Sequence, residues 1–179
     1  FILYGQKRSG KSSVLYHLQK QLINSECFFS FSFSLGSIVE SSSNTSFTTS
    51  FLYKILSSIE ESLDDLEMQS HSVPLFKMCS YEELKQNPSI IFEEILKNFQ
   101  RNCRTIPSWS TRSLVLLVDE FTYLYKLILE GKVSNDFMKF WKALIEKGVF
   151  KAILAGQDTM PKFKLAFANE FGVTQDERL

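Results

Sequence analysis

Residues 2–15 read ILYGQKRSGKSSVL, and this stretch decides the fold that the sequence predicts. A short apolar run stops at Gly5, a polar and basic segment follows, and a helical pattern of apolar residues begins after Lys11. Residues 5–12, GQKRSGKS, fit the spacing G-x-x-x-x-G-K-[ST] of a loop whose backbone N–H groups surround phosphates. The loop follows a predicted strand and starts a predicted helix, which is the context that phosphate binding requires.

Each part of this loop has an expected task in binding a nucleotide. Gly5 lets the strand turn sharply, and Gly10 lets the backbone approach the phosphates without a Cβ in the way. Lys11 brings a positive charge to the β and γ phosphates, Ser12 offers a hydroxyl to Mg²⁺, and Ser13 can donate to the α-phosphate. A glycine-rich turn with a surface lysine is the alternative. The predicted nucleotide-binding residues are Gly5, Gln6, Lys7, Arg8, Ser9, Gly10, Lys11, Ser12 and Ser13.

The stretch LVLLVDEF, residues 114–121, predicts the acidic part of the same site. Its apolar run is typical of a strand that is buried on both faces of a parallel sheet. We expect Asp119 to hold Mg²⁺, usually through its water shell, and Glu120 to polarise the attacking water as general base. An acidic pair at a strand end is common by itself, but beside a phosphate loop it indicates catalysis.

A third stretch, FKAILAGQD at residues 150–158, predicts a further strand that ends beside the acidic pair. Ligands bind at the carboxyl ends of strands in open α/β sheets. Gln157 is the first candidate to touch the γ-phosphate or position the water, and Asp158 is the second. A plain turn after the strand is the alternative. The expected catalytic residues are Glu120, Lys11 and Gln157.

The order of elements predicts one α/β unit with a parallel sheet that is covered on both faces by helices. The predicted strands are residues 1–4, 27–35, 114–118, 149–155 and 173–179. The predicted helices are residues 11–24, 51–66, one from a Ser80–Glu83 capping box, 88–99 with Asn87 as N-cap, 134–148 and 162–169. Residues 36–50, rich in Ser and Thr, are expected to be a solvated loop.

Composition excludes several classes of protein. Hydrophobic residues make up 44% of the 179 residues, which is typical of a globular protein. Lys and Arg equal Asp and Glu at 20 each, so nucleic acid is not an indicated partner. The three cysteines, at positions 27, 79 and 103, lack metal-like spacing and indicate reduced thiols and a cytoplasmic location. No apolar run approaches the ~20 residues that span a bilayer, so we expect no membrane partner.

With these three stretches in this order, the chain resembles the AAA+/STAND branch of P-loop ATPases. It is most similar to bacterial STAND-type signalling ATPases and more distantly to origin-recognition initiator ATPases. The resemblance runs from residue 1 to about residue 172 and implies a three-layer P-loop NTPase fold with sheet order 5-1-4-3-2, binding ATP and Mg²⁺. It also implies a nucleotide state that changes packing on other domains of the same polypeptide or on other copies. The family's helical lid is expected beyond Leu179, and Arg178 is an ordinary surface residue rather than an arginine finger.

These features predict that residues 1–179 form an ATPase core that acts as a nucleotide-controlled switch. Two alternatives stay open: a nucleotide-binding scaffold that does not hydrolyse ATP, and the ATPase of a DNA-associated machine whose DNA contacts lie elsewhere. A GTPase is disfavoured because no [NT]-K-x-D guanine signature is present. The helices within residues 46–102 either cover one sheet face or reach a partner, and their apolar stripes favour cover. Four further residues are expected to be surface or packing residues only, namely His17, His71, Trp109 and Trp141.

Overall fold

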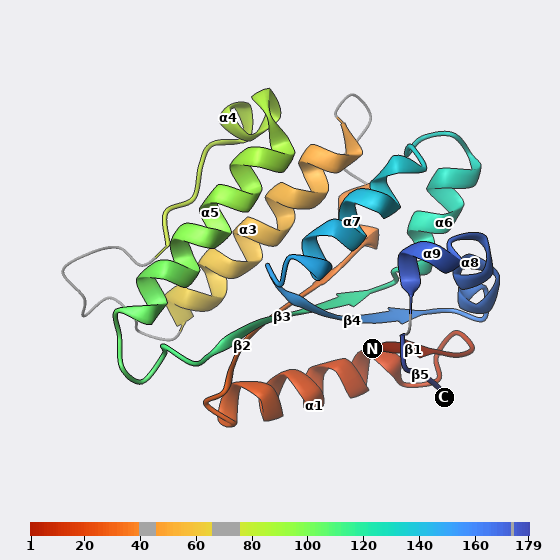
Figure 1. The fold of residues 1–179 in the computed structure, drawn as a ribbon. Coiled ribbons are helices and arrows are strands. Elements are labelled where there is room, and N and C mark those ends of the chain that lie inside the picture. The colour runs from red at the N-terminus through yellow and green to blue at the C-terminus, as the bar shows by residue number, and fades with distance from the viewer. Residues whose placement is uncertain (40–45, 66–75, 173) are drawn as a thin grey trace.

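The structure is a computed structural model that describes residues 1–39, 46–65, 76–172 and 174–179. It is an α/β fold in which helices pack on both faces of a five-stranded sheet (Figure 1). The strands are β1 Ile2–Tyr4, β2 Phe28–Ser34, β3 Ser113–Asp119, β4 Lys151–Gly156 and β5 Asp176–Arg178. The helices are α1 Lys11–Asn24, α2 Gly36–Val39, α3 Phe47–Asp65, α4 Tyr81–Gln86, α5 Pro88–Arg104, α6 Thr122–Leu129, α7 Asp136–Glu146, α8 Met160–Ala166 and α9 Ala168–Phe171.

The sheet has the order β2-β3-β4-β1-β5, and every neighbouring pair is parallel. Read from the β5 edge, this is 5-1-4-3-2, the order that the resemblance implies. Because all strands run the same way, their carboxyl ends lie along one edge. The register brings Ser34 opposite Asp119 and Tyr4 opposite Gly156, so neighbouring strands end level with each other.

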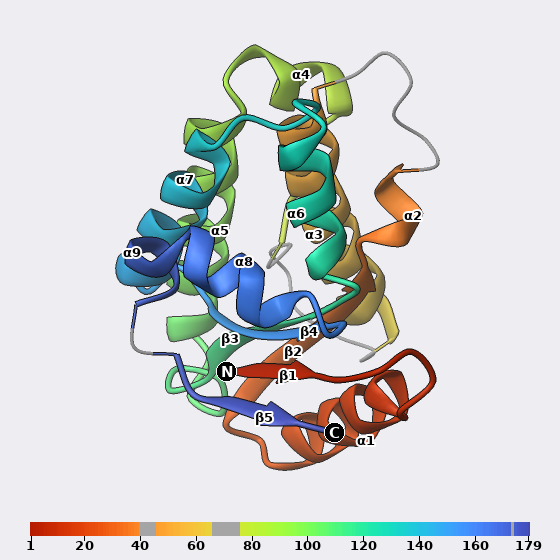
Figure 2. The ribbon, with the colours of Figure 1, turned by 90° about the vertical axis from the view of Figure 1, so that its right-hand side faces the viewer.

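The two faces of the sheet are covered by different helices (Figures 1 and 2). α1 packs below β2, β3 and β4, whereas α3 packs above β2 and contacts α4 and α5. The buried residues of α3 and α5 belong to the same core cluster as those of the sheet. The helices within residues 46–102 therefore cover a sheet face, as expected, in the part that the structure describes.

The alternation of Phe and Ser in β2 matches these two environments. Phe29, Phe31 and Phe33 are buried in the large core cluster on the α3 side. The intervening serines face α1, where the Ser32 hydroxyl donates to Gln19 Oε1 at 2.8 Å. The predicted strand with one strongly apolar face is confirmed.

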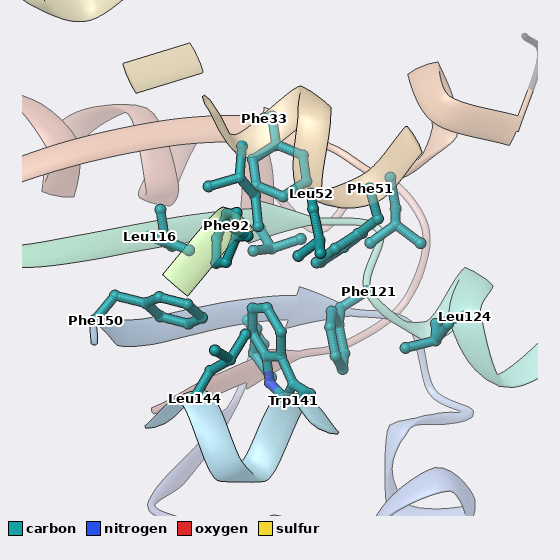
Figure 3. Packing of buried hydrophobic residues seen from close by; sticks show 14 of the residues in the cluster. Phe33, Phe51, Leu52, Phe92, Leu116, Phe121, Leu124, Trp141, Leu144 and Phe150 are labelled. Carbon is teal, nitrogen blue, oxygen red and sulfur yellow. The ribbon is translucent and has the colours of Figure 1, made fainter. Parts of the chain in front are cut away.

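Aromatic rings make up the centre of the core (Figure 3). Phe51 of α3 is fully buried, and its ring meets those of Phe33, Phe137 and Trp141 at centroid distances of 5.6, 5.1 and 5.4 Å. These neighbours belong to β2 and α7. The Phe51 side chain, which comes from α3, therefore joins the sheet to both helices. Trp141 is a packing residue, as expected, and Trp109 packs edge-on against Phe29.

Several element boundaries differ from the expectation. The expected loop 36–50 contains α2 and the first turn of α3, because Ile38 and Phe47 are buried and anchor both helices. The expected helix 162–169 is two helices, α8 and α9, because Phe167 has a non-helical backbone (φ −125, ψ 44). Leu66, His71 and Val173 lie outside the described residues.

Helix starts were predicted with mixed success. Both hydrogen bonds of the Ser80–Glu83 capping box are present, and the one from the Ser80 amide is the main cause that lowers the pKa of Glu83. Asn87 precedes α5 but its side chain makes no capping hydrogen bond. α6 was not predicted at all. Among the described residues, no helix is both long and apolar enough to cross a membrane.

Replacing Phe51 tests the aromatic core. We expect Phe51→Ala to lower the free energy of unfolding by about 3–5 kcal/mol, because the cavity removes ring contacts with both β2 and α7. Leu165→Ala is the control, since Leu165 is 81% exposed and should change stability by less than about 0.5 kcal/mol. Urea titration measures both, and equal effects of the two substitutions would contradict this packing.

Candidate functional site

All three predicted motifs meet at the carboxyl edge of the sheet. The residues between Tyr4 and Lys11 leave β1 and enter α1, while Asp119 and Gln157 lie at the ends of β3 and β4. The Gly5 amide donates to the Gly156 carbonyl of β4 at 3.3 Å. The pairing of β4 with both β1 and β3 therefore brings segments more than a hundred positions apart to one place.

The loop between β1 and α1 is a tight turn. The Ser9 amide donates to the Gln6 carbonyl at 3.2 Å, and the first α1 hydrogen bond runs from Val14 to Gly10 at 2.9 Å. Gly10 has φ +87, a left-handed conformation in which a residue with a Cβ costs about 1–2 kcal/mol. Gly5 is needed for another reason: a Cβ there would collide with the carbonyl oxygen of Leu179, which follows β5.

Lys11 is held inside this loop. Its side chain is buried with 8% exposed, and its ammonium donates to three oxygens of the loop itself. These are the carbonyls of Gly5 (3.0 Å) and Gln6 (2.5 Å) and the Ser9 hydroxyl (3.2 Å). The loop is thus wrapped around one positive charge at the amino end of a 14-residue helix, and the helix dipole adds to that charge.

The first two motifs are joined by a direct contact. The Ser12 hydroxyl donates to Asp119 Oδ2 at 2.5 Å, between residues 107 positions apart. The other carboxylate oxygen, Oδ1, accepts from the Glu120 amide at 2.7 Å. Ser12 and Asp119 therefore form a pair of converging oxygens that could hold a divalent cation. Ser13, next along α1, is exposed.

Glu120 adopts an unusual backbone conformation and has its own partner. Its φ of +56 lies in the left-handed region, which is costly for a residue other than glycine. Its Oε2 accepts from the Ser34 hydroxyl at 2.8 Å, and the same hydroxyl accepts from the Gly36 amide at 3.2 Å. A Cβ on Gly36 would run into the Glu120 carboxylate, so this glycine makes room for it.

Ser34 and Gly36 were missed by the sequence analysis, which treated residue 36 as the start of a loop. The signal was present, because Ser34 is the last polar residue of the Phe–Ser strand. A strand next to β3 must end at the same edge as Asp119. The local pattern does not show which strand lies next to β3, so the sequence alone does not connect this serine to the acidic pair.

At the carboxyl edge of the sheet, the third motif makes its hydrogen bond through a backbone amide and not through a side chain. The Gln157 amide donates to the hydroxyl of Thr122, a buried residue at the start of α6, at 3.1 Å, while the Gln157 side chain is exposed. Asp158 Oδ1 lies 3.9 Å from Arg178 Nη2, at the end of β5. Gln157 is therefore near the acidic pair in the fold, and Asp158 is instead turned toward β5.

The candidate site lies on an exposed edge of the sheet and does not coincide with either of two hollows in the molecule. Two hollows of about 410 and 470 Å³ lie at the opposite, amino-terminal edge, around Trp109 and Trp141 respectively. Neither is lined by a residue of the loop 5–12 or by Asp119, Glu120 or Gln157. Within the described residues, no group of three or more His, Cys, Asp or Glu side chains could hold a metal. His17 is an exposed residue of α1, as expected.

No protein-family model matches this sequence, and a search of curated proteins finds no match.

Gly156 tests the packing of the end of β4 against the first residues of α6 and α8. A Cβ at this position would lie 2.6 Å from both Met160 Cε and Thr122 Cγ2. We expect Gly156→Ala to displace Thr122 and lower the free energy of unfolding by about 1–3 kcal/mol in urea titrations. Gly148→Ala is a control with no atom within 4 Å but φ +67, and should cost only about 1 kcal/mol. A Gly156→Ala protein as stable as the wild type would contradict the close packing.

Proposed function

We propose that this chain is the core of a magnesium-dependent ATPase that acts as a nucleotide-controlled switch in a larger multidomain protein. Its nucleotide state would change how the core packs on other domains of the polypeptide or on other copies of itself. The observation that carries the proposal is the contact between Ser12 and Asp119, because it joins a phosphate-loop sequence to an acidic strand end. Chance glycine-rich turns do not require such a partner.

The loop supports triphosphate binding by its position and charge. A helix N-terminus offers unpaired N–H groups, and the dipole of α1 favours an anion there. The ammonium of Lys11 is already among the loop oxygens, where a phosphate oxygen can replace a carbonyl as its acceptor. A lysine serves this purpose well because its ammonium is a compact charge with three donors.

The residues at the sheet edge fit Mg²⁺. This ion prefers oxygen ligands at 2.0–2.1 Å in an octahedron, so neighbouring ligands are about 2.9 Å apart. Ser12 Oγ and Asp119 Oδ2 are hydrogen-bonded at 2.5 Å, so an ion that Ser12 binds directly would have the Asp119 carboxylate beside it, where it can accept from the ion's water ligands. Magnesium typically keeps several waters and uses one or two carboxylates plus substrate phosphates, so a larger cluster of acidic side chains is not needed. When bound, the ion neutralises charge on the β and γ phosphates.

Glu120 is the proposed general base. Its carboxylate would take a proton from a water molecule as the water oxygen attacks the γ-phosphorus and the bond to the β–γ bridging oxygen breaks, which releases ADP and phosphate. Ser34 holds Oε2, and within the described residues Oε1 has no hydrogen-bond donor, so Oε1 is free to accept from water. Gln157 is proposed to position this water or to touch the γ-phosphate.

A second candidate function is a nucleotide-binding scaffold with negligible turnover. The Ser34–Glu120 hydrogen bond favours it, because a carboxylate in which one oxygen already accepts from a fixed hydroxyl is a less mobile base. Single-turnover measurements on the full chain distinguish the two candidates. Bound ATP that stays intact for hours would support the scaffold.

Two substitutions test the ATPase proposal on the full chain. We expect Lys11→Ala to abolish ATP binding, because the loop loses its buried cation. We expect Glu120→Gln to retain ATP binding but to hydrolyse ATP at least ~100-fold more slowly, since the amide cannot accept a proton. Phosphate-release assays measure hydrolysis, and Glu146→Gln, on the exposed end of α7, is the matched control. Wild-type hydrolysis in Glu120→Gln would exclude this residue as the base.

A further inference from the structure

Arg8 occupies a position in the loop that usually belongs to glycine. The hydrogen bond from Ser9 to Gln6 closes a four-residue turn, with Lys7 and Arg8 as its two middle residues. Arg8 has φ +69, and a left-handed third residue in such a turn is normally Gly or Asn. Gly10, two residues further on, also has a positive φ and is a glycine. The chain therefore tolerates backbone strain at Arg8 that a glycine would remove.

Nothing in the described part of the fold uses the Arg8 side chain. Its guanidinium is exposed and has no hydrogen bond or ion pair there. Two other cations near the edge do have partners: Lys11 is bonded to loop oxygens, and Arg178 lies beside Asp158. Strained residues at a binding edge persist when they serve function rather than stability. Arg8 fits that description because it contributes strain and no internal contact.

We propose that the Arg8 guanidinium binds the polyphosphate chain of the nucleotide from the solvent side of the loop, opposite the buried ammonium of Lys11. This inference rests on the proposed function. A guanidinium presents two parallel N–H donors to a phosphate, which a lysine cannot do, and it stays charged at any physiological pH. With Arg8, two cations of the loop contact the polyphosphate, whereas without it only Lys11 does.

The charge of the ligand decides how much Arg8 contributes. ATP has one phosphate and about one negative charge more than ADP. Adenosine has no phosphate and no negative charge. Arg8 therefore favours the triphosphate over the diphosphate and makes no difference to adenosine. In a nucleotide-controlled switch, this residue sets the preference between the two nucleotide states.

The experiment compares Arg8→Gly, Arg8→Lys and Lys7→Gly with the wild-type full chain. Lys7 is the matched control, because it is an exposed cation in the same turn without a positive φ. Thermal unfolding without nucleotide measures the strain, and equilibrium dialysis with labelled ATP and ADP in Mg²⁺ measures affinity. We expect Arg8→Gly to raise the melting temperature and to weaken ATP binding roughly tenfold or more, with a smaller loss for ADP.

The remaining variants refine the result. Arg8→Lys should keep the strain and recover part of the affinity, and Lys7→Gly should not raise the melting temperature and should weaken ATP binding less than Arg8→Gly. If the wild type binds ATP and Arg8→Gly binds it equally well, the role of Arg8 is overturned while the proposed function stands. If Arg8→Gly lowers both affinity and melting temperature, Arg8 is a structural residue and the inference fails. If the wild type binds no nucleoside triphosphate, the proposed function fails as well.

Discussion

The parallel pairing of β4 with β1 on one side and with β3 on the other determines the candidate site. If these strands ran in mixed directions, their carboxyl ends would lie at opposite edges of the sheet. Because they are parallel, the loop around Lys11 and the carboxylate of Asp119 come to the same edge, and Ser12 reaches Asp119 directly. The adjacent β2 then brings Ser34 level with Glu120 by the same register.

The edge is also where the backbone departs most from its preferred conformations. Among the described non-glycine residues, a positive φ occurs at Arg8, Glu26 and Glu120, and two of these three are at the site. Strain of this kind needs a rigid support. The aromatic core around Phe51 and Trp141 supplies it, because it fastens the helices above the sheet to β2. The same contrast between a stable core and a strained edge is common at functional sites.

The sequence predicted the strands and the loop well, since apolar runs and a spaced motif are local signals. It did not predict contacts that depend on which strands are neighbours, and Ser34 is the clearest case. The start of α3 was missed because Phe47 follows a serine-rich stretch, and its burial depends on α7. α6 was missed because no capping side chain marks its start, although Phe121, Leu124 and Ile128 are buried at helical spacing. The catalytic roles are chemical predictions that the fold supports by proximity alone.

Calorimetric titration of the full chain with ATP, with and without Mg²⁺, tests the central claim most directly. If the loop and Asp119 form one nucleotide and metal site, about one ATP binds per chain, and binding weakens when magnesium is removed or when Asp119 is changed to Asn. The Asp158→Asn protein should behave like the wild type, because Asp158 is turned toward Arg178. Folded protein that releases no heat of binding with any nucleoside triphosphate, in either condition, would contradict the account.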